Sequence, residues 1–134
     1  MIQIHKRKIE QLESQGLIRF KISGTTFIQP DIYRLILILH QKKQTPKITL
    51  KPEPENKYDS NAVLVLAELK LGTSNPKLFK IGYVPRQDDF NKKVKQLLKA
   101  KHCTVWLHDI KIIEEPNNSL DVPISSVEIQ LDIN

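Results

Sequence analysis

The pattern of hydrophobic and polar residues changes its period several times along the chain. Residues 3–15 carry apolar side chains at roughly helical spacing among charged ones, namely Ile4, Ile9 and Leu12. Gly16 follows them and is a suitable helix C-cap. From 17 to 22 the period shortens to two, with apolar residues on one face and the cations Arg19 and Lys21 on the other. The pattern therefore predicts an amphipathic helix followed by a half-buried strand.

The segment 31–41 has two interpretations. Asp31 is a suitable N-cap for a helix whose apolar residues recur at helical spacing, namely Ile32, Leu35, Ile36 and Leu39. The β-branched residues of the same segment also permit a buried strand. We favour the helix and keep the strand as the alternative.

After Pro46 the pattern indicates a series of short strands separated by turns. The expected strands are 47–51, 62–67, 78–84, 104–113 and 127–133, with a turn at 69–77 and a loop at 115–123. Asp88 or Asp89 is expected to cap a helix that reaches about Lys101. Its inner face carries Phe90, Val94, Leu97 and Leu98. Trp106, on an alternating strand, is expected in the core.

These elements predict an α+β fold that is mainly β. We expect a small antiparallel β-barrel of five to six strands with flanking helices. Residues 1–16 are expected to form an N-terminal helical extension and residues 17–134 the domain proper. A chain of 134 residues can bury one ordinary core without disulfides or metals, and its single cysteine excludes an internal disulfide.

Composition points to a cytoplasmic protein that does not enter a membrane. Hydrophobic residues make up 40% and charged residues 27% of the chain, and no apolar run approaches the length of a bilayer span. The net charge of +6 favours a polyanion only if the cations cluster. Several lysines between 92 and 101 lie on the expected helix, where the plainer interpretation is a solvated face.

The loop 53–63 carries the most informative chemistry. Its sequence is Glu-Pro-Glu-Asn-Lys-Tyr-Asp-Ser-Asn-Ala-Val. Asn56, Asp59 and Asn61 are good turn formers, Asn61 could lead the chain into the next strand through an Asx turn, and Tyr58 could cover the core. An exposed tyrosine can instead stack on a nucleic-acid base, and a neighbouring carboxylate can accept a hydrogen bond from a terminal hydroxyl.

This loop, together with the later Ile-Gly-Tyr-Val-Pro-Arg at 81–86 and the helix after it, resembles the HIRAN domain family. The family's loop reads roughly Glu-Pro-x-Asn-Pro-Tyr-Asp-x-Asn-Ala-Ile, and its later strand reads Ile-Gly-Tyr-Val-Pro. Ile-Ser-Gly-Thr-Thr-Phe at 22–27 is similar to the family's first strand. The resemblance extends over about 18–115. Lys57 departs from it by replacing the usual proline, and residues 28–46 are longer and more apolar than in typical members.

The resemblance implies an OB-like barrel that captures single-stranded DNA by its free 3′ end in repair or replication-fork processing, together with a helicase or nuclease partner. Tyr58 would stack on the terminal base and Asp59 would accept a hydrogen bond from the 3′-hydroxyl. The other implied DNA contacts are Asn56, Tyr83, Arg86, Arg19 and Lys21. No enzymatic activity, cofactor or metal is expected.

Two other functions remain open at the level of sequence. One is a protein-interaction module of the same fold without end recognition. The other is a Mg²⁺-dependent nuclease, since Asp59, Glu68 and Lys70 echo an Asp…Glu-x-Lys arrangement. The second is the weaker, because Glu-x-Lys is common by chance in a lysine-rich chain.

Overall fold

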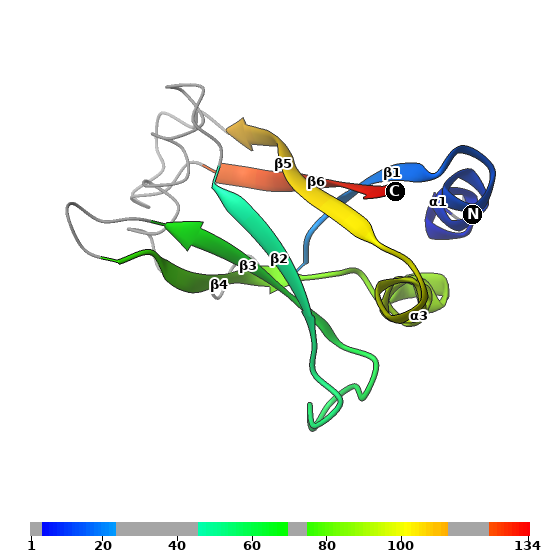
Figure 1. Cartoon of the computed structure of the whole chain (residues 1–134), viewed down its shortest axis with the longest axis horizontal. Coiled ribbons are helices and arrows are strands. Elements are labelled where there is room, and N and C mark those ends of the chain that lie inside the picture. Colours follow the sequence, from blue (N-terminus) through cyan, green and yellow to red (C-terminus); the bar gives the residue numbers. More distant parts are fainter. Residues whose placement is uncertain (1–3, 24–45, 70–74, 113–123) are drawn as a thin grey trace.

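A computed structural model describes residues 4–23, 46–69, 75–112 and 124–134 (Figure 1). The segment 31–41, which could be helix or strand, lies outside the described residues, as do the whole of the expected loop 115–123 and most of the turn 69–77.

Six antiparallel strands form two three-stranded sheets in the described part of the chain. The first sheet has the order β1 (Leu17–Lys21), β6 (Ile124–Ile133) and β5 (Cys103–Ile112), and the second β2 (Lys47–Pro52), β3 (Val63–Leu69) and β4 (Lys77–Tyr83). The helices are α1 (Ile4–Gln15) and α3 (Phe90–Ala100), with a short 3-10 turn, η2 (Gln87–Asp89), before α3. The α+β, mainly β class and the strand positions are confirmed.

The expected barrel is not closed by hydrogen bonds over the described residues. On one side the sheets are joined by a single bridge, in which Ser23 and Tyr83 exchange backbone hydrogen bonds of 2.9 and 2.8 Å. On the other side β2 packs beside β5, but among the described residues no backbone hydrogen bond links these two strands. The fold is therefore two sheets around one core.

Alternation along the strands directs one face of each sheet into this core. Phe20 of β1 and Phe90 of α3 are fully buried, and their rings meet edge-on with centroids 5.4 Å apart. Leu12 attaches α1 to the same core at 1% exposure. Both helices lie at one end of the molecule (Figure 1) and are joined by an ion pair of 3.0 Å between Glu13 and Lys93.

The start of α3 differs from the prediction of a capping aspartate. Asp89 is the N-cap residue, but its side chain makes no capping hydrogen bond. Asp88 and Asp89 have φ of 56° and 58°, in the left-handed region, whereas a capping side chain needs an extended backbone at this position. The two aspartates thus form a sharp turn, after which Phe90 enters the core.

Trp106 is on the surface, and its assignment to the core was wrong. Its side chain is 48% exposed, because alternation at this point of β5 gives the inward position to its neighbour, the buried Leu107. The indole Nε1–H donates to Oδ2 of Asp132 at 2.8 Å. Neither α1 nor α3, the helices that the structure describes, is long and apolar enough to cross a lipid bilayer.

Candidate nucleic-acid interface

The loop from Glu53 to Ala62 connects β2 to β3 and is held by its own backbone. The Glu53 N–H donates to the Ala62 carbonyl at 2.8 Å, which continues the β2–β3 pairing by one rung. The Ala62 N–H donates to the carbonyl of Asp59 at 3.0 Å. These bonds present residues 56–59 as a compact projection.

Two side chains form the turns of this projection. Oδ1 of Asn56 accepts the N–H groups of Tyr58 and Asp59 at 2.9 and 3.1 Å, and Oδ1 of Asp59 accepts the N–H of Asn61 at 2.8 Å. Asn56 and Asp59 therefore make the Asx turns, in place of the one expected from Asn61. The turn-forming role predicted for Asn56 and Asp59 is present, and the Asx turn before β3 comes from Asp59 and not from Asn61.

Asp59 is also fixed from outside the loop by Asn91 of α3. The Asn91 Nδ2 donates to Oδ2 of Asp59 at 2.7 Å, while its Oδ1 accepts the N–H of Lys92 at 2.9 Å. Asn91 is only 3% exposed and is the one buried polar residue of the described chain. Both carboxylate oxygens of Asp59 are thus oriented, and each keeps a lone pair for a further donor.

Sequence reasoning missed Asn91, although a signal existed. The residue shares the inner helical face of Val94 and Leu98, at spacings of three and seven. A polar residue on that face is a candidate for a buried hydrogen bond.

Tyr83 is tied to the same loop through Glu53. Its hydroxyl donates to Oε1 of Glu53 at 3.0 Å, and the Asn56 Nδ2 donates to the same oxygen at 3.2 Å. Partial desolvation, this hydrogen bond and the charge of Glu53 all raise the pKa of Tyr83 above its usual value of 10.0. The phenol consequently remains a neutral donor at physiological pH.

These residues surround an open cavity of about 660 Å³, lined by Asn56, Tyr58, Asp59, Tyr83, Arg86 and Asn91 among others. The Tyr58 side chain is 92% exposed, so it does not cover the core. Arg86 is exposed at the rim, and within the described part of the chain its guanidinium has no carboxylate partner. The cavity therefore offers an aromatic face, a fixed carboxylate and a free cation.

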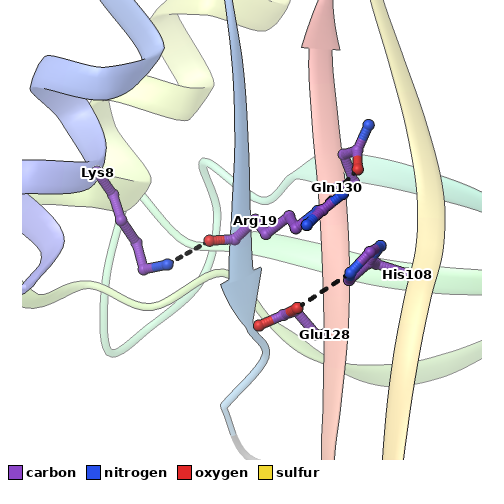
Figure 2. A network of polar contacts seen from close by, with 5 residues as sticks. All are labelled: Lys8, Arg19, His108, Glu128 and Gln130. Atoms are coloured by element: carbon purple, nitrogen blue, oxygen red, sulfur yellow. Dashed lines mark hydrogen bonds and ion pairs between the residues drawn. The ribbon is translucent and has the colours of Figure 1, made fainter.

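Arg19 and Lys21 do not line this cavity. Arg19 points across the outer face of its sheet, where its Nε donates to Oε1 of Gln130 at 3.0 Å and its carbonyl accepts Lys8 Nζ (Figure 2). Lys21 is exposed and lies opposite Glu128 in the β1–β6 register. Their role in DNA binding stays a prediction, and the structure groups the other five candidates without them.

The arrangement does not assemble a nuclease site from described residues. Asp59 precedes β3 and Glu68 lies near its far end, opposite Lys47, and Lys70 is outside the described residues. No group of three or more His, Cys, Asp or Glu side chains within the described ranges could hold a metal ion. Burial raises the pKa of the Cys103 thiol, which keeps it protonated.

Comparison with known protein families supplies the identification. The family model described as the HIRAN domain matches residues 15–132, nearly the whole chain. The chain belongs to the HIRAN domain family. The comparison with curated proteins gave no match, and the comparison with solved structures gave none either.

Membership of the HIRAN family indicates the general role of this domain. HIRAN domains are DNA-binding modules rather than catalytic ones. The match begins at 15, so almost all of α1 precedes it. The cavity, with its exposed tyrosine, fixed aspartate and free arginine, is accordingly the candidate DNA interface of this HIRAN domain.

Proposed function

We propose that this HIRAN domain captures single-stranded DNA by its free 3′ end, without cleaving it, in DNA repair or replication-fork processing. The observation that carries the proposal is the pairing of Tyr58 and Asp59. The tyrosine ring is almost fully exposed beside the cavity, and the carboxylate next to it in sequence is held in one orientation by Asn61 and Asn91.

Tyr58 supplies the stacking surface for the terminal base. Stacking of a base on an aromatic side chain contributes about 1–3 kcal/mol and tolerates every base, because each has a π face. The Asx turn of Asn56 fixes the backbone at Tyr58, so less conformational entropy is lost when the ring engages a base. The tyrosine therefore gives affinity without sequence preference.

Asp59 supplies the preference for the end. Its carboxylate can accept a hydrogen bond from a 3′-hydroxyl, whereas it repels a 3′-phosphate or the phosphate of a continuing strand. Hydrogen bonds to charged groups contribute about 1.5–3 kcal/mol, which corresponds to roughly tenfold to a hundredfold in affinity. The fixed position of both carboxylate oxygens means that no reorganisation is needed to make this bond.

Arg86 offsets the negative charge of Asp59 and Glu53. Its guanidinium, free at the rim of the cavity, can bind a backbone phosphate in bidentate fashion. Tyr83, a neutral donor bound to Glu53, keeps that carboxylate oriented within the loop. Unwinding or cleavage of the captured strand would then be the work of a helicase or nuclease partner.

The test measures fluorescence anisotropy with short single-stranded oligonucleotides that end in a 3′-hydroxyl or a 3′-phosphate. We expect the 3′-hydroxyl form to bind at least about tenfold more tightly. Asp59→Asn removes the charge and should reduce this preference to about twofold or less. Equal affinity of the wild type for both ends would overturn end capture, and absence of binding at low salt would overturn DNA binding altogether in favour of a protein-interaction module.

A second pair of variants isolates stacking. Tyr58→Ala should weaken binding of every oligonucleotide by about 1–3 kcal/mol, with the end preference unchanged. The matched control Tyr58→Phe keeps the ring and should bind like the wild type. Equal loss in both variants would assign the effect to the hydroxyl instead of the ring face.

A further inference from the structure

The helix α3 has an unusual distribution of charge. Its 11 residues include four lysines and no aspartate or glutamate. Lys93 is paired with Glu13 of α1 at 3.0 Å. The remaining three, Lys92, Lys95 and Lys99, have no carboxylate partner among the described residues. We call these three the lysine stripe.

The lysine stripe occupies one face of the helix. At 100° per residue the positions 92, 95 and 99 fall within an arc of about 60°, on the side opposite the buried Phe90 and Val94. Lys92 and Lys99 are exposed. The stripe thus faces solvent along almost the full length of α3.

The stripe starts at the DNA cavity. Lys92 follows Asn91, which lines the cavity and holds Asp59. Lys95 Nζ donates to the carbonyl of Ser60 at 3.1 Å, directly beside Asp59 in the loop, and keeps two further donors. A strand that leaves the cavity on this side therefore meets these lysines next.

The position of Lys92 is unfavourable for the helix itself. A lysine in the first turn opposes the helix dipole, whereas Lys99, in the last turn, favours it. No carboxylate within α3 offsets the charge of Lys92. Asp88 and Asp89 are exposed just before the helix, and their charge disfavours a nucleic-acid path around its N-terminus.

We propose that the lysine stripe binds the phosphate backbone of the single-stranded DNA whose 3′ end occupies the cavity. This inference rests on the proposed function and extends it from the terminal nucleotide to those that precede it. Lys92 and Lys99 are separated by a rise of about 10 Å. That exceeds the axial rise of roughly 3.4 Å per phosphate along one strand of duplex DNA, so the stripe spans more than one phosphate. The lysines that sequence alone assigns to a solvated face thereby form the second part of the interface.

The test is the salt dependence of binding for 3′-hydroxyl oligonucleotides of increasing length. Each phosphate contact on a single strand contributes about 0.7 to the slope of log affinity against log salt. The triple variant Lys92→Gln, Lys95→Gln and Lys99→Gln should lower the slope by about 2 for long oligonucleotides, and by much less for the shortest ones. The preference for 3′-hydroxyl over 3′-phosphate should remain.

Two further variants separate this proposal from its alternatives. The double variant Lys92→Gln and Lys99→Gln leaves the Lys95–Ser60 bond intact, and should still lower the slope by about 1.4. A control with Lys47, Lys77 and Lys80 changed to Gln removes the same total charge from exposed positions of β2 and β4, and should leave the slope nearly unchanged. An unchanged slope in the stripe variants, or an equal fall in the control, overturns the proposal.

The two proposals fail separately. If the wild type shows no end preference while the stripe variants lose slope, end capture is wrong and the backbone contact stands. If the end preference is present but the salt slope depends neither on oligonucleotide length nor on the stripe, end capture stands and the stripe proposal is wrong.

Discussion

At the scale of single residues, the interface depends on a few side chains that hold other side chains. The side chains of Asn56 and Asn91 form hydrogen bonds with the loop residues that would meet DNA, and Glu53 accepts from both Asn56 and Tyr83. The chemistry proposed for Tyr58 and Asp59 therefore relies on neighbours that need not touch the ligand. Two predictions address these neighbours.

Asn91→Ala should lower the free energy of unfolding by about 1–3 kcal/mol, because it leaves Oδ2 of a half-buried carboxylate without its donor. The freed Asp59 should also lose part of its discrimination between 3′-hydroxyl and 3′-phosphate ends. Gln96→Ala, at an exposed position of the same helix, is the control and should change neither quantity. Chemical denaturation and the anisotropy titrations provide the measurements. Unchanged end discrimination in Asn91→Ala would restrict this residue to a structural role.

Tyr83 should make stability sensitive to alkaline pH. Its pKa is raised in the folded state above 10.0, so its contribution to stability is fully present below about pH 10 and is lost as the pH rises through the folded-state value. Tyr83→Phe should cost about 1 kcal/mol at neutral pH. Above about pH 10 the variant should lose stability less steeply than the wild type. Denaturant unfolding at a series of pH values measures this difference, and parallel curves would contradict it.

At the scale of elements, the irregular strand β4 links the two sheets to the candidate site. The β3–β4 register shifts between Val65 and Leu66, which leaves Ile81 as an extra residue on β4. Gly82 follows with φ of 152° and lies against the backbone of Ser23. Because Ser23 and Tyr83 exchange hydrogen bonds there, this bulge both joins the two sheets and aims Tyr83 at the loop.

Gly82→Ala should destabilise the protein by about 2 kcal/mol or more. A Cβ at this position would lie 2.7 Å from the Ser23 carbonyl oxygen and 3.0 Å from Cδ1 of Ile22. Gly16→Ala is the matched control, since Gly16 also has positive φ (74°) but its Cβ would meet nothing closer than 3.9 Å. It should cost only the conformational strain, about 1 kcal/mol. Thermal or denaturant unfolding compares the two, and equal losses would show that contact with Ser23 is unimportant.

At the scale of the whole molecule, two sheets and two helices share one core, and the site lies where α3 meets the β2–β3 loop. Phe90 places α3 against β1 through its edge-on contact with Phe20. The next residue, Asn91, reaches Asp59. The position of the Asp59 carboxylate, which we propose to bind the 3′-hydroxyl, is thus coupled to the packing of the core.

Phe90→Ala should lower the free energy of unfolding by about 3–5 kcal/mol through loss of buried surface and a residual cavity. DNA binding at temperatures where the variant is still folded should weaken as well, because α3 no longer positions Asn91. Phe79→Ala removes a half-buried ring on β4 and should cost less, with binding retained. Unfolding experiments and anisotropy on the same samples test the coupling. Full affinity in folded Phe90→Ala would show that the site tolerates a shifted helix.

Local patterns were sufficient for most elements. Alternation located every described strand within a few residues, and helical spacing located α1 and α3, since both signals are carried by neighbours in sequence. The prediction was wrong at two places where the local pattern permits more than one arrangement. On β5 it is Leu107, and not Trp106, that faces the core. Asp88 and Asp89 before α3 adopt left-handed backbone conformations and do not cap the helix with their side chains. These outcomes depend on the fit of the core, which a local pattern does not contain.

Sequence alone was enough to identify the α+β class, the loop at 53–63 and its resemblance to HIRAN domains, because these depend on residue types at short, regular spacings. Only the tertiary structure showed that Tyr58 is exposed, that Asp59 is held by a helix residue 32 positions away, and that Arg19 lies on another surface. It also placed the lysine stripe beside the cavity. Contacts between distant segments are set by the packing of sheets and helices, and that packing is a property of the whole chain.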